Sequence, residues 1–133
     1  MSDYLETELR KHVFRTGSFT KPTVLAIGLF TAAPSDSGGG TEVSGGSYAR
    51  VQRDPLDANW TGASGTSGLT DNAAVLTFPA PSANWGVITH FGIFDAISAG
   101  NLLFWGALTT PKTVNNGDPA PQFNAGAFDV TFA

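Results

Sequence analysis

The first apolar residues of the chain repeat with the period of an α-helix. Leu5, Leu9 and Val13 are spaced four residues apart, so they lie on one face of a helix. Asp3 can cap the start of this helix as the first residue of a capping box, and Gly17 offers a C-cap. The pattern predicts an amphipathic helix of about three turns that rests on an apolar surface.

Beyond residue 22 the period changes to the alternation that is typical of β-strands. Residues 23–31 are apolar on both faces, as expected of a central strand that is covered twice. Residues 85–94 and 101–108 flank a turn-rich segment and are predicted to form a β-hairpin. Shorter runs predict further strands at residues 48–53, 73–78 and 127–132.

About six or seven short strands separated by turn signals predict an all-β fold, a single compact β-sandwich with a short N-terminal α-helix. The 133 residues fit one domain, with residues 1–17 as an amphipathic helix packed on or beside a sandwich of residues 22–133. Two connections, residues 34–47 and 54–71, are long and rich in small polar residues, and long loops in compact domains are commonly functional. The second contains Trp60, which either covers the core or contacts a partner.

Charge narrows the range of partners. Charged residues make up 14% of the chain, against about 25% in an average domain. The net charge of −4 argues against a nucleic-acid partner, which would require a basic face. Residues 1–53 hold six Lys or Arg and five Asp or Glu, whereas residues 54–133 hold only Lys112 against six Asp. An acidic body with a basic N-terminal segment suggests that the two ends face different neighbours.

The sequence also indicates whether the protein has disulfides, a signal segment or a membrane-spanning segment. It contains no cysteine, which excludes disulfides and thiolate zinc sites. Charged residues interrupt the first 14 positions, so no apolar signal core is present there. The longest apolar run, residues 24–30, is too short to cross a bilayer. We therefore expect a soluble protein with no membrane partner, and the absence of cysteine is compatible with synthesis in the cytosol.

Residues suited to catalysis are few. Of the two histidines, His12 lies in the predicted helix and His90 in an apolar strand, where a packed structural role is expected. Residues 45–49 loosely match the nucleophile elbow of hydrolases but lack the strand before it and the helix after it. The glycines at 38–40 are not followed by the Gly-Lys-Ser/Thr of a phosphate loop. We expect no enzymatic activity, no cofactor and no metal site.

Several long strings in a fixed order connect the chain to a known family. They are Tyr4-Leu-Glu6, Leu29-Phe-Thr-Ala-Ala-Pro34, Tyr48-Ala-Arg50, Trp85-Gly-Val-Ile-Thr-His-Phe-Gly-Ile-Phe-Asp95, Gly100-Asn-Leu-Leu-Phe-Trp-Gly-Ala-Leu108 and Lys112-Thr-Val-Asn-Asn-Gly-Asp118. In this order they resemble a family of small phage virion proteins usually labelled tail-fibre or minor tail proteins. The likeness covers nearly the whole chain and is weakest at residues 54–70 and 119–126. It implies a non-enzymatic structural protein on the exterior of a tailed double-stranded DNA bacteriophage, without a cofactor.

The position on the particle stays open between several hypotheses. The chain lacks the heptads and repeats of elongated trimeric fibres, so its shape favours a capsid decoration or cement protein that stabilises the head lattice. The resemblance favours the alternative, a tail-fibre or minor tail protein, including a fibre base. A carbohydrate- or receptor-binding β module is a further alternative, in which Trp60 stacks on a sugar while Asp57, Asn59 and Asp71 bind its hydroxyls. A hydrolase with His90 as base is the remaining one.

The expected partners are other virion proteins, either the major capsid protein or tail proteins, at the virion surface. Further copies of the chain are also expected, and a trimer fits the closed cyclic symmetry that repeated positions favour. Arg10, Lys11 and Arg15 either dock on an acidic surface or form an ordinary solvated helix face. The candidate partner contacts are Tyr4, Leu5, Leu9, Arg10, Lys11, Arg15 and Trp60.

Overall fold

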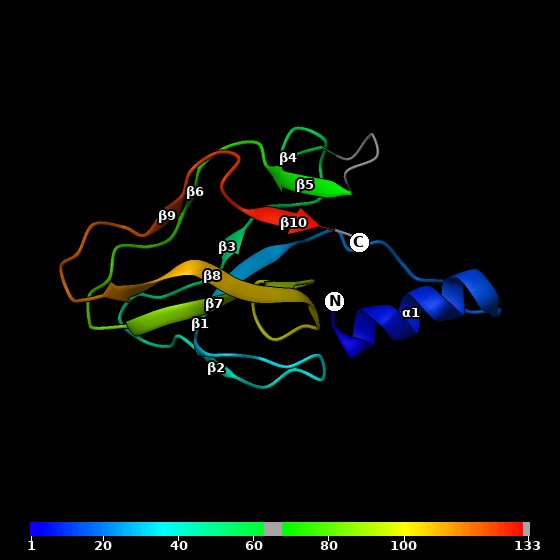
Figure 1. Cartoon of the computed structure of the whole chain (residues 1–133), viewed down its shortest axis with the longest axis horizontal. Coiled ribbons are helices and arrows are strands. Elements are labelled where there is room, and N and C mark those ends of the chain that lie inside the picture. Colours follow the sequence, from blue (N-terminus) through cyan, green and yellow to red (C-terminus); the bar gives the residue numbers. More distant parts are fainter. Residues whose placement is uncertain (63–67, 132–133) are drawn as a thin grey trace.

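The computed structural model describes residues 1–62 and 68–131, which form two β layers and one helix (Figure 1). The larger layer is a five-stranded antiparallel sheet built from β1 (Ala26–Ala32), β2 (Thr41–Glu42), β3 (Val51–Gln52), β7 (Gly86–Phe94) and β8 (Leu102–Val114). Its order is β2-β1-β7-β8, and β3 also pairs with β1. Within the described chain β8 pairs only with β7, so β8 is an edge strand.

Two smaller antiparallel sheets form the second layer. One contains β4 (Trp60–Thr61), β5 (Leu69–Asn72) and β10 (Asp129–Thr131), and the other contains β6 (Leu76–Thr77) and β9 (Gln122–Phe123). The two layers share one core, in which Ile27, Ile88 and Ile93 of the large sheet pack with Leu76 and Phe128. Burial of apolar surface between the layers is the main stabilising contribution to such a fold. The prediction of an all-β fold is confirmed.

The opposite face of the large sheet is also covered. Phe30 of β1 and Phe94 of β7 stack with their ring centroids 6.2 Å apart, and Leu102 joins them in a second buried cluster. The guanidinium of Arg50 lies over the Phe94 ring, 3.3 Å from its centroid. Residues 26–30 of β1 are therefore buried on both faces, as the apolar run at residues 23–31 predicts.

The predicted hairpin is confirmed, but its second strand is longer than expected. β7 and β8 pair antiparallel, and β8 continues past residue 108 to Val114. The register shifts between the pairs Ile88↔Lys112 and His90↔Ala107, which leaves the residues around Pro111 in a bulge. Proline has no N–H to donate, so an edge strand with a bulge is a position that accepts it.

Other boundaries also differ from the sequence pattern. The segment 54–71, predicted to be a loop, contains β4 and the first residues of β5. These strands are short and pair with each other and with the distant β10, so no local alternation marks them. The run at residues 73–78 contributes only the two residues of β6. The run at 127–132 contributes β10, and its last residue lies outside the described part of the chain.

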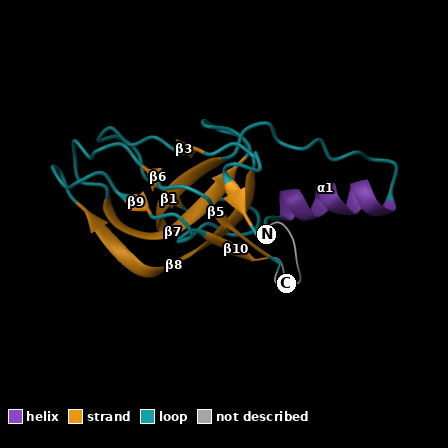
Figure 2. Cartoon of the chain, turned by 90° about the horizontal axis from the view of Figure 1, so that it is seen from above, coloured by secondary structure: helices purple, strands orange, loops and turns teal. Residues whose placement is uncertain are grey.

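The helix α1 (Asp3–Phe14) extends away from the two layers, as both views of the chain show (Figures 1 and 2). Its N-cap is Ser2 rather than the predicted Asp3, because the Ser2 side chain accepts the hydrogen bond from the backbone N–H of Leu5. Asp3 and Glu6 lie in the first turn, where the helix dipole favours acidic residues.

Candidate interaction surfaces

The first turn of α1 is fixed to the end of the large sheet. The Ser2 hydroxyl donates to the carbonyl of Leu102 at 2.5 Å, and the Ser2 N–H donates to the carbonyl of Leu103 at 2.9 Å. The N–H of Asp3 donates to the carbonyl of Asp36 at 2.9 Å, in the loop that follows β1. Leu5 is 4% exposed. These contacts tie the helix to the start of β8 and to the first long loop.

Beyond this turn, α1 is not packed on the layers. Of the predicted apolar stripe only Leu5 is buried; Leu9 is half-buried and Val13 is exposed. Phe14, at the end of the helix, is 79% exposed, and Tyr4 is also exposed. The expectation that the whole stripe rests on an apolar surface is therefore wrong within this chain. Beyond its first turn the helix thus leaves apolar side chains exposed, among them Phe14, although Phe is one of the residue types most often buried.

The basic side chains of α1 face solvent. Lys11 forms an exposed ion pair with Glu8 at 2.7 Å. The Arg10 guanidinium donates to the Thr7 hydroxyl at 3.3 Å, and neither Arg10 nor Arg15 has a carboxylate partner among the described residues. Two unpaired arginines therefore lie beside the exposed Phe14 at the free end of α1.

Trp60 covers the core of its own chain. Its indole N–H donates to the carbonyls of Arg53 at 3.3 Å and Asp54 at 3.1 Å. Its ring lies 6.4 Å from the ring of Phe128, which is buried. Of the two interpretations of Trp60, the structure supports packing against the core, and Trp60 also lines a cavity.

Of the polar residues near Trp60, Asn59 and Asp71 are held by internal contacts. Asn59 donates to the carbonyl of Asp54 at 2.9 Å, and the Asp71 carboxylate accepts a hydrogen bond from Thr61 across the β4–β5 pair. Asp57 is exposed and lies at the edge of the cavity. Asn59 and Asp71 therefore do not offer free polar atoms to a sugar stacked on Trp60, as the carbohydrate-binding alternative requires.

The cavity beside Trp60 has a volume of about 270 Å³. Most of its lining is apolar; it consists of Leu25, Pro55, Leu56, Asp57, Trp60, Thr70, Ile93, Phe104 and Val130. Leu56 on its rim is 59% exposed, and Asp57 is the acidic residue of the lining. The site therefore suits an apolar side chain that has a basic neighbour. Sequence reasoning did not find it, because its lining comes from segments far apart in the chain.

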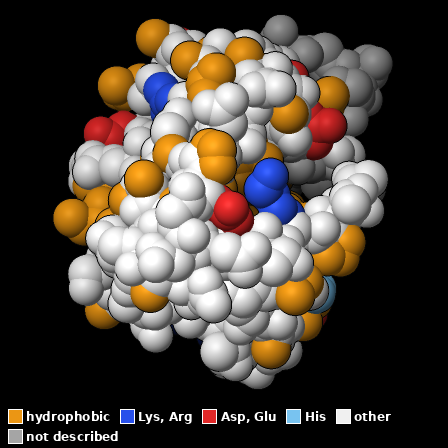
Figure 3. Space-filling model, turned by 90° about the vertical axis from the view of Figure 1, so that its left-hand side faces the viewer, with side chains coloured by type: hydrophobic (Ala, Val, Ile, Leu, Met, Phe, Trp, Pro, Cys, Tyr) orange, Lys and Arg blue, Asp and Glu red, His pale blue; other side chains and the backbone are white. Residues whose placement is uncertain are grey.

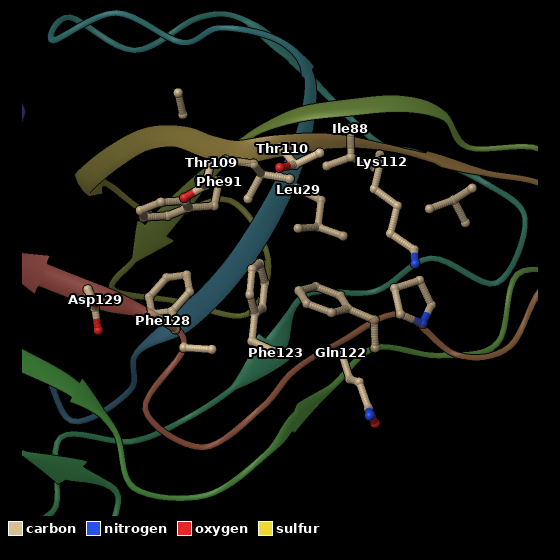
Figure 4. Close-up of a pocket in the computed structure, with 16 residues that line it drawn as sticks. Leu29, Ile88, Phe91, Thr109, Thr110, Lys112, Gln122, Phe123, Phe128 and Asp129 are labelled. Atoms are coloured by element: carbon tan, nitrogen blue, oxygen red, sulfur yellow. The ribbon is translucent and has the colours of Figure 1, made fainter.

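A larger hollow of about 380 Å³ lies between β8 and the second layer. Phe91, Phe123 and Phe128 line its interior (Figure 4). Lys112 and Asp129 lie toward opposite ends of this row of rings in the same view. The hollow thus marks an opening in the sandwich along edge strand β8, and the two separated charges form no acid–base pair.

His90 packs beside Trp105 in this fold. It is half-buried, its Nδ1 lies 2.8 Å from the Thr89 hydroxyl, and its ring centroid lies 6.1 Å from that of Trp105. The Trp105 indole in turn donates to the Asp36 carboxylate at 2.9 Å. These contacts agree with the expected packed role.

The network around Glu42 is a further feature that sequence analysis missed. Its carboxylate receives hydrogen bonds from Tyr48 at 2.9 Å and from two nitrogens of Arg50 at 2.8 and 2.7 Å. The Tyr48 hydroxyl accepts from the Leu29 N–H at 2.8 Å. Burial, and then the negative charge of Glu42, raise the pKa of the Tyr48 phenol above its ordinary value. The sequence feature that could have revealed this network is the string Tyr48-Ala-Arg50. In an extended segment, residues two apart point to the same side, so both side chains can bond to one partner.

Few charged side chains lie on the end of the molecule away from α1 (Figures 1 and 3). The end of the molecule in Figure 3 shows scattered hydrophobic side chains and only a few basic and acidic ones. Within residues 1–62 and 68–131, no group of three or more His, Cys, Asp or Glu is placed to hold a metal ion. No helix of the described chain is long and apolar enough to cross a membrane.

Comparison with known proteins agrees with the sequence resemblance. Residues 1–131 match the family model described as podophage GP4 fiber I protein gp80. Among curated proteins no match was found. The resemblance to phage tail-fibre proteins is thereby confirmed over almost the entire chain.

Proposed function

Because the chain belongs to the podophage GP4 fiber I protein family, we propose that it is a non-enzymatic structural component of the tail-fibre apparatus on the outside of a podophage particle. The observation that carries this proposal is the match over residues 1–131, which spans the helix and both β layers. A fibre family supports a structural role in the virion and association with other virion proteins.

The same match favours a fibre component over a capsid decoration protein. The preference for the head rested on shape, that is, on a compact domain without heptads or repeats. The structure removes part of that argument, since α1 extends away from the layers and is held only at its first turn (Figure 2). A β-rich body with one projecting helix suits a component that joins a larger assembly by one end.

Within that assembly, α1 is the proposed docking element. Tyr4, Arg10 and Arg15 are exposed, and Leu9 is half-buried. Lys11 is exposed, although it is paired with Glu8. Leu5 leaves the set of partner contacts because it is buried against its own chain. The apolar side chains of this helix are exposed to water, and their burial against a partner would be favourable because it removes apolar surface from water.

Cryo-electron microscopy of the intact particle tests the proposal, with a particle lacking this protein as the control. Density of this size in the tail-fibre region, missing from the control, is the expected result. Density at the symmetry axes of the head, bridging capsid subunits, would instead replace the fibre assignment with capsid decoration. Binding of host polysaccharide to the purified chain would favour the receptor-binding alternative.

A further inference from the structure

The free end of α1 and the cavity beside Trp60 have complementary chemistry. We propose that Phe14 of one copy inserts into the Trp60 cavity of a second copy, with Arg10 next to Asp57 at the rim. This inference rests on the proposed function in one respect, namely that α1 is the docking element. It goes further by naming the partner as another copy of the same chain.

The donor side of this contact is the last turns of α1. Phe14 is 79% exposed and Val13 is 64% exposed, so both are available to a partner. Arg10 precedes Phe14 by four residues and therefore lies on the same face of the helix. A partner that suits this end of the helix has an apolar cavity for the phenyl ring and a carboxylate nearby for the guanidinium.

The acceptor side offers both of these features. A cavity of about 150 Å³ lined by apolar side chains is known to hold benzene. The Trp60 cavity, of about 270 Å³ and lined mainly by apolar residues, thus has room for a phenyl ring. Asp57 at its rim is exposed and has no basic partner among the described residues. The Asp57 carboxylate can therefore receive an arginine from outside.

The arrangement of the chain favours a second copy over self-insertion. A helix of 12 residues is about 18 Å long, so α1 carries Phe14 away from its own layers. Val130 of β10 lines the cavity, and β10 runs toward the end of the layers from which α1 departs (Figures 1 and 2). Lys21, on the segment returning from the helix, donates to the Pro55 carbonyl at this rim.

With this placement, two copies can each insert the end of α1 into the cavity of the other. When α1 of one copy runs alongside α1 of a second copy in the opposite direction, each free end reaches the other copy's cavity. Every such contact is then made twice within a closed assembly, which is the usual form of soluble homo-oligomers. A ring in which each α1 enters the next cavity uses the same contact and gives the predicted trimer.

Sedimentation equilibrium of the full chain, over a range of concentrations, tests the contact. The wild-type protein is expected at a multiple of its 13.8 kDa mass. Phe14→Ser removes a largely exposed ring, so it leaves the fold intact and weakens association by about tenfold or more. Val87→Ser is the matched control, since Val87 is 48% exposed on β7 and should leave association unchanged. A wild-type chain that stays at 13.8 kDa, or equal effects of the two variants, would overturn the proposal.

A charge exchange tests the partner residues named at the rim. Arg10→Asp alone and Asp57→Arg alone should each weaken association, because each places like charges together. The combined variant should recover most of the lost affinity, and the wild-type contact should weaken as salt rises. Failure of the combined variant to recover would overturn the pairing of Arg10 with Asp57.

Particle incorporation separates this inference from the proposed function. If Phe14→Ser is lost from particles while Asp57→Arg is retained and the wild-type chain is monomeric, α1 docks on a different virion protein and the second-copy proposal fails alone. If the solution contact behaves as expected but the protein is found on the head, the fibre assignment fails and the self-association stands.

Discussion

At the scale of single residues, the Arg50 guanidinium joins several groups on the face of the large sheet away from the core. It binds both oxygens of Glu42, donates to the carbonyls of Ala96 at 3.1 Å and Ala99 at 2.7 Å, and lies over Phe94. Its side chain is 10% exposed. A planar guanidinium satisfies all of these partners at once, which an ammonium group cannot do.

Substitution of Arg50 should therefore be costly. Arg50→Leu leaves Glu42 without its counter-charge and should lower the free energy of unfolding by about 3–5 kcal/mol. Arg50→Lys keeps the charge but loses the paired hydrogen bonds, and about 1–3 kcal/mol is expected. Urea unfolding measures both. The control is Lys11→Ser at the exposed Lys11–Glu8 pair, which should cost less than about 1 kcal/mol. Equal effects at the two sites would contradict this account.

Tyr48 gives the same network a dependence on pH. Its pKa is raised in the folded chain, so the contribution of the neutral phenol is complete below the unfolded pKa of about 10. As pH rises above about 10, the unfolded chain loses this proton while the folded chain keeps it. Stability should then fall by about 1.4 kcal/mol per pH unit for this group. Urea unfolding measures the slope. At about pH 8 the contribution of Tyr48 is still complete, and at about pH 11, above the unfolded pKa, its loss should be visible.

Tyr48→Phe is the variant that assigns the slope. It should be less stable than the wild type at neutral pH, because the Leu29 N–H and Glu42 each lose a partner. It should also lose the added alkaline slope. A slope that persists in Tyr48→Phe would show that a different group causes it.

At the scale of elements, Asn72 joins β5 to the segment before β10. It is fully buried, and its side-chain nitrogen donates to the carbonyls of Ala74 and Asn124, both at 2.8 Å. Its side-chain oxygen accepts from the Phe128 N–H at 2.9 Å. All hydrogen-bonding atoms of this buried amide are thus used, which is the condition under which a buried polar group stabilises a fold.

Asn72→Asp tests this junction with almost no change in size. A carboxylate cannot donate to the two carbonyls and would place a charge at a fully buried position, so a loss of about 3 kcal/mol or more is expected. Asn84→Asp is the control, because exposed Asn84 only accepts, from the Asn116 N–H, and Asp retains that acceptor. Thermal unfolding of the two variants provides the comparison, and similar midpoints would refute the role given to Asn72.

The N-cap of α1 gives a prediction for a second element. Ser2→Ala removes the cap on the Leu5 N–H and the bond to the Leu102 carbonyl, at a cost of about 0.5–2 kcal/mol. The loss should fall on the helix, since the backbone and core of the layers are untouched. Hydrogen exchange should quicken in α1 and stay unchanged in β1 and β7. Ser18→Ala, at an exposed position after the helix, should change neither region.

These elements differ in how well they could be predicted from the sequence. The apolar run of β1 and the β7–β8 hairpin were predictable because their patterns are local and buried on defined faces. The strands β4 and β5 were not, because β4 forms through its pairing with β5 and β5 pairs with the distant β10. The helix was predictable, but its exposure was not. An apolar stripe indicates that a face is covered, and it does not say whether the cover comes from the same chain.

At the scale of the whole molecule, the helix that carries the candidate contacts was predictable from its pattern, whereas the cavity was not. The cavity joins Leu25, Ile93 and Val130, which only the folded chain brings together. The structure also shows where the unevenly distributed charged residues of the sequence lie. The basic residues Arg10 and Lys11 lie on the projecting helix, and the acidic residues after position 53 lie in the strands and connecting segments of the β layers. The single-domain organisation stays a prediction.

This separation of charge leads to a prediction for the assembled particle. Arg10, Lys11 and Arg15 are replaced together by Gln, which keeps the propensity for helix. Each lost charge at a docked surface is expected to cost about 0.5 kcal/mol, so occupancy on the virion should weaken by roughly tenfold at physiological salt. Quantitative gel analysis of washed particles measures the occupancy, and circular dichroism verifies that the variant is folded. Lys112→Gln on β8 is the control, because this basic residue lies away from α1. Unchanged occupancy of the triple variant would assign the three residues to an ordinary solvated helix face and leave docking to the apolar end of α1.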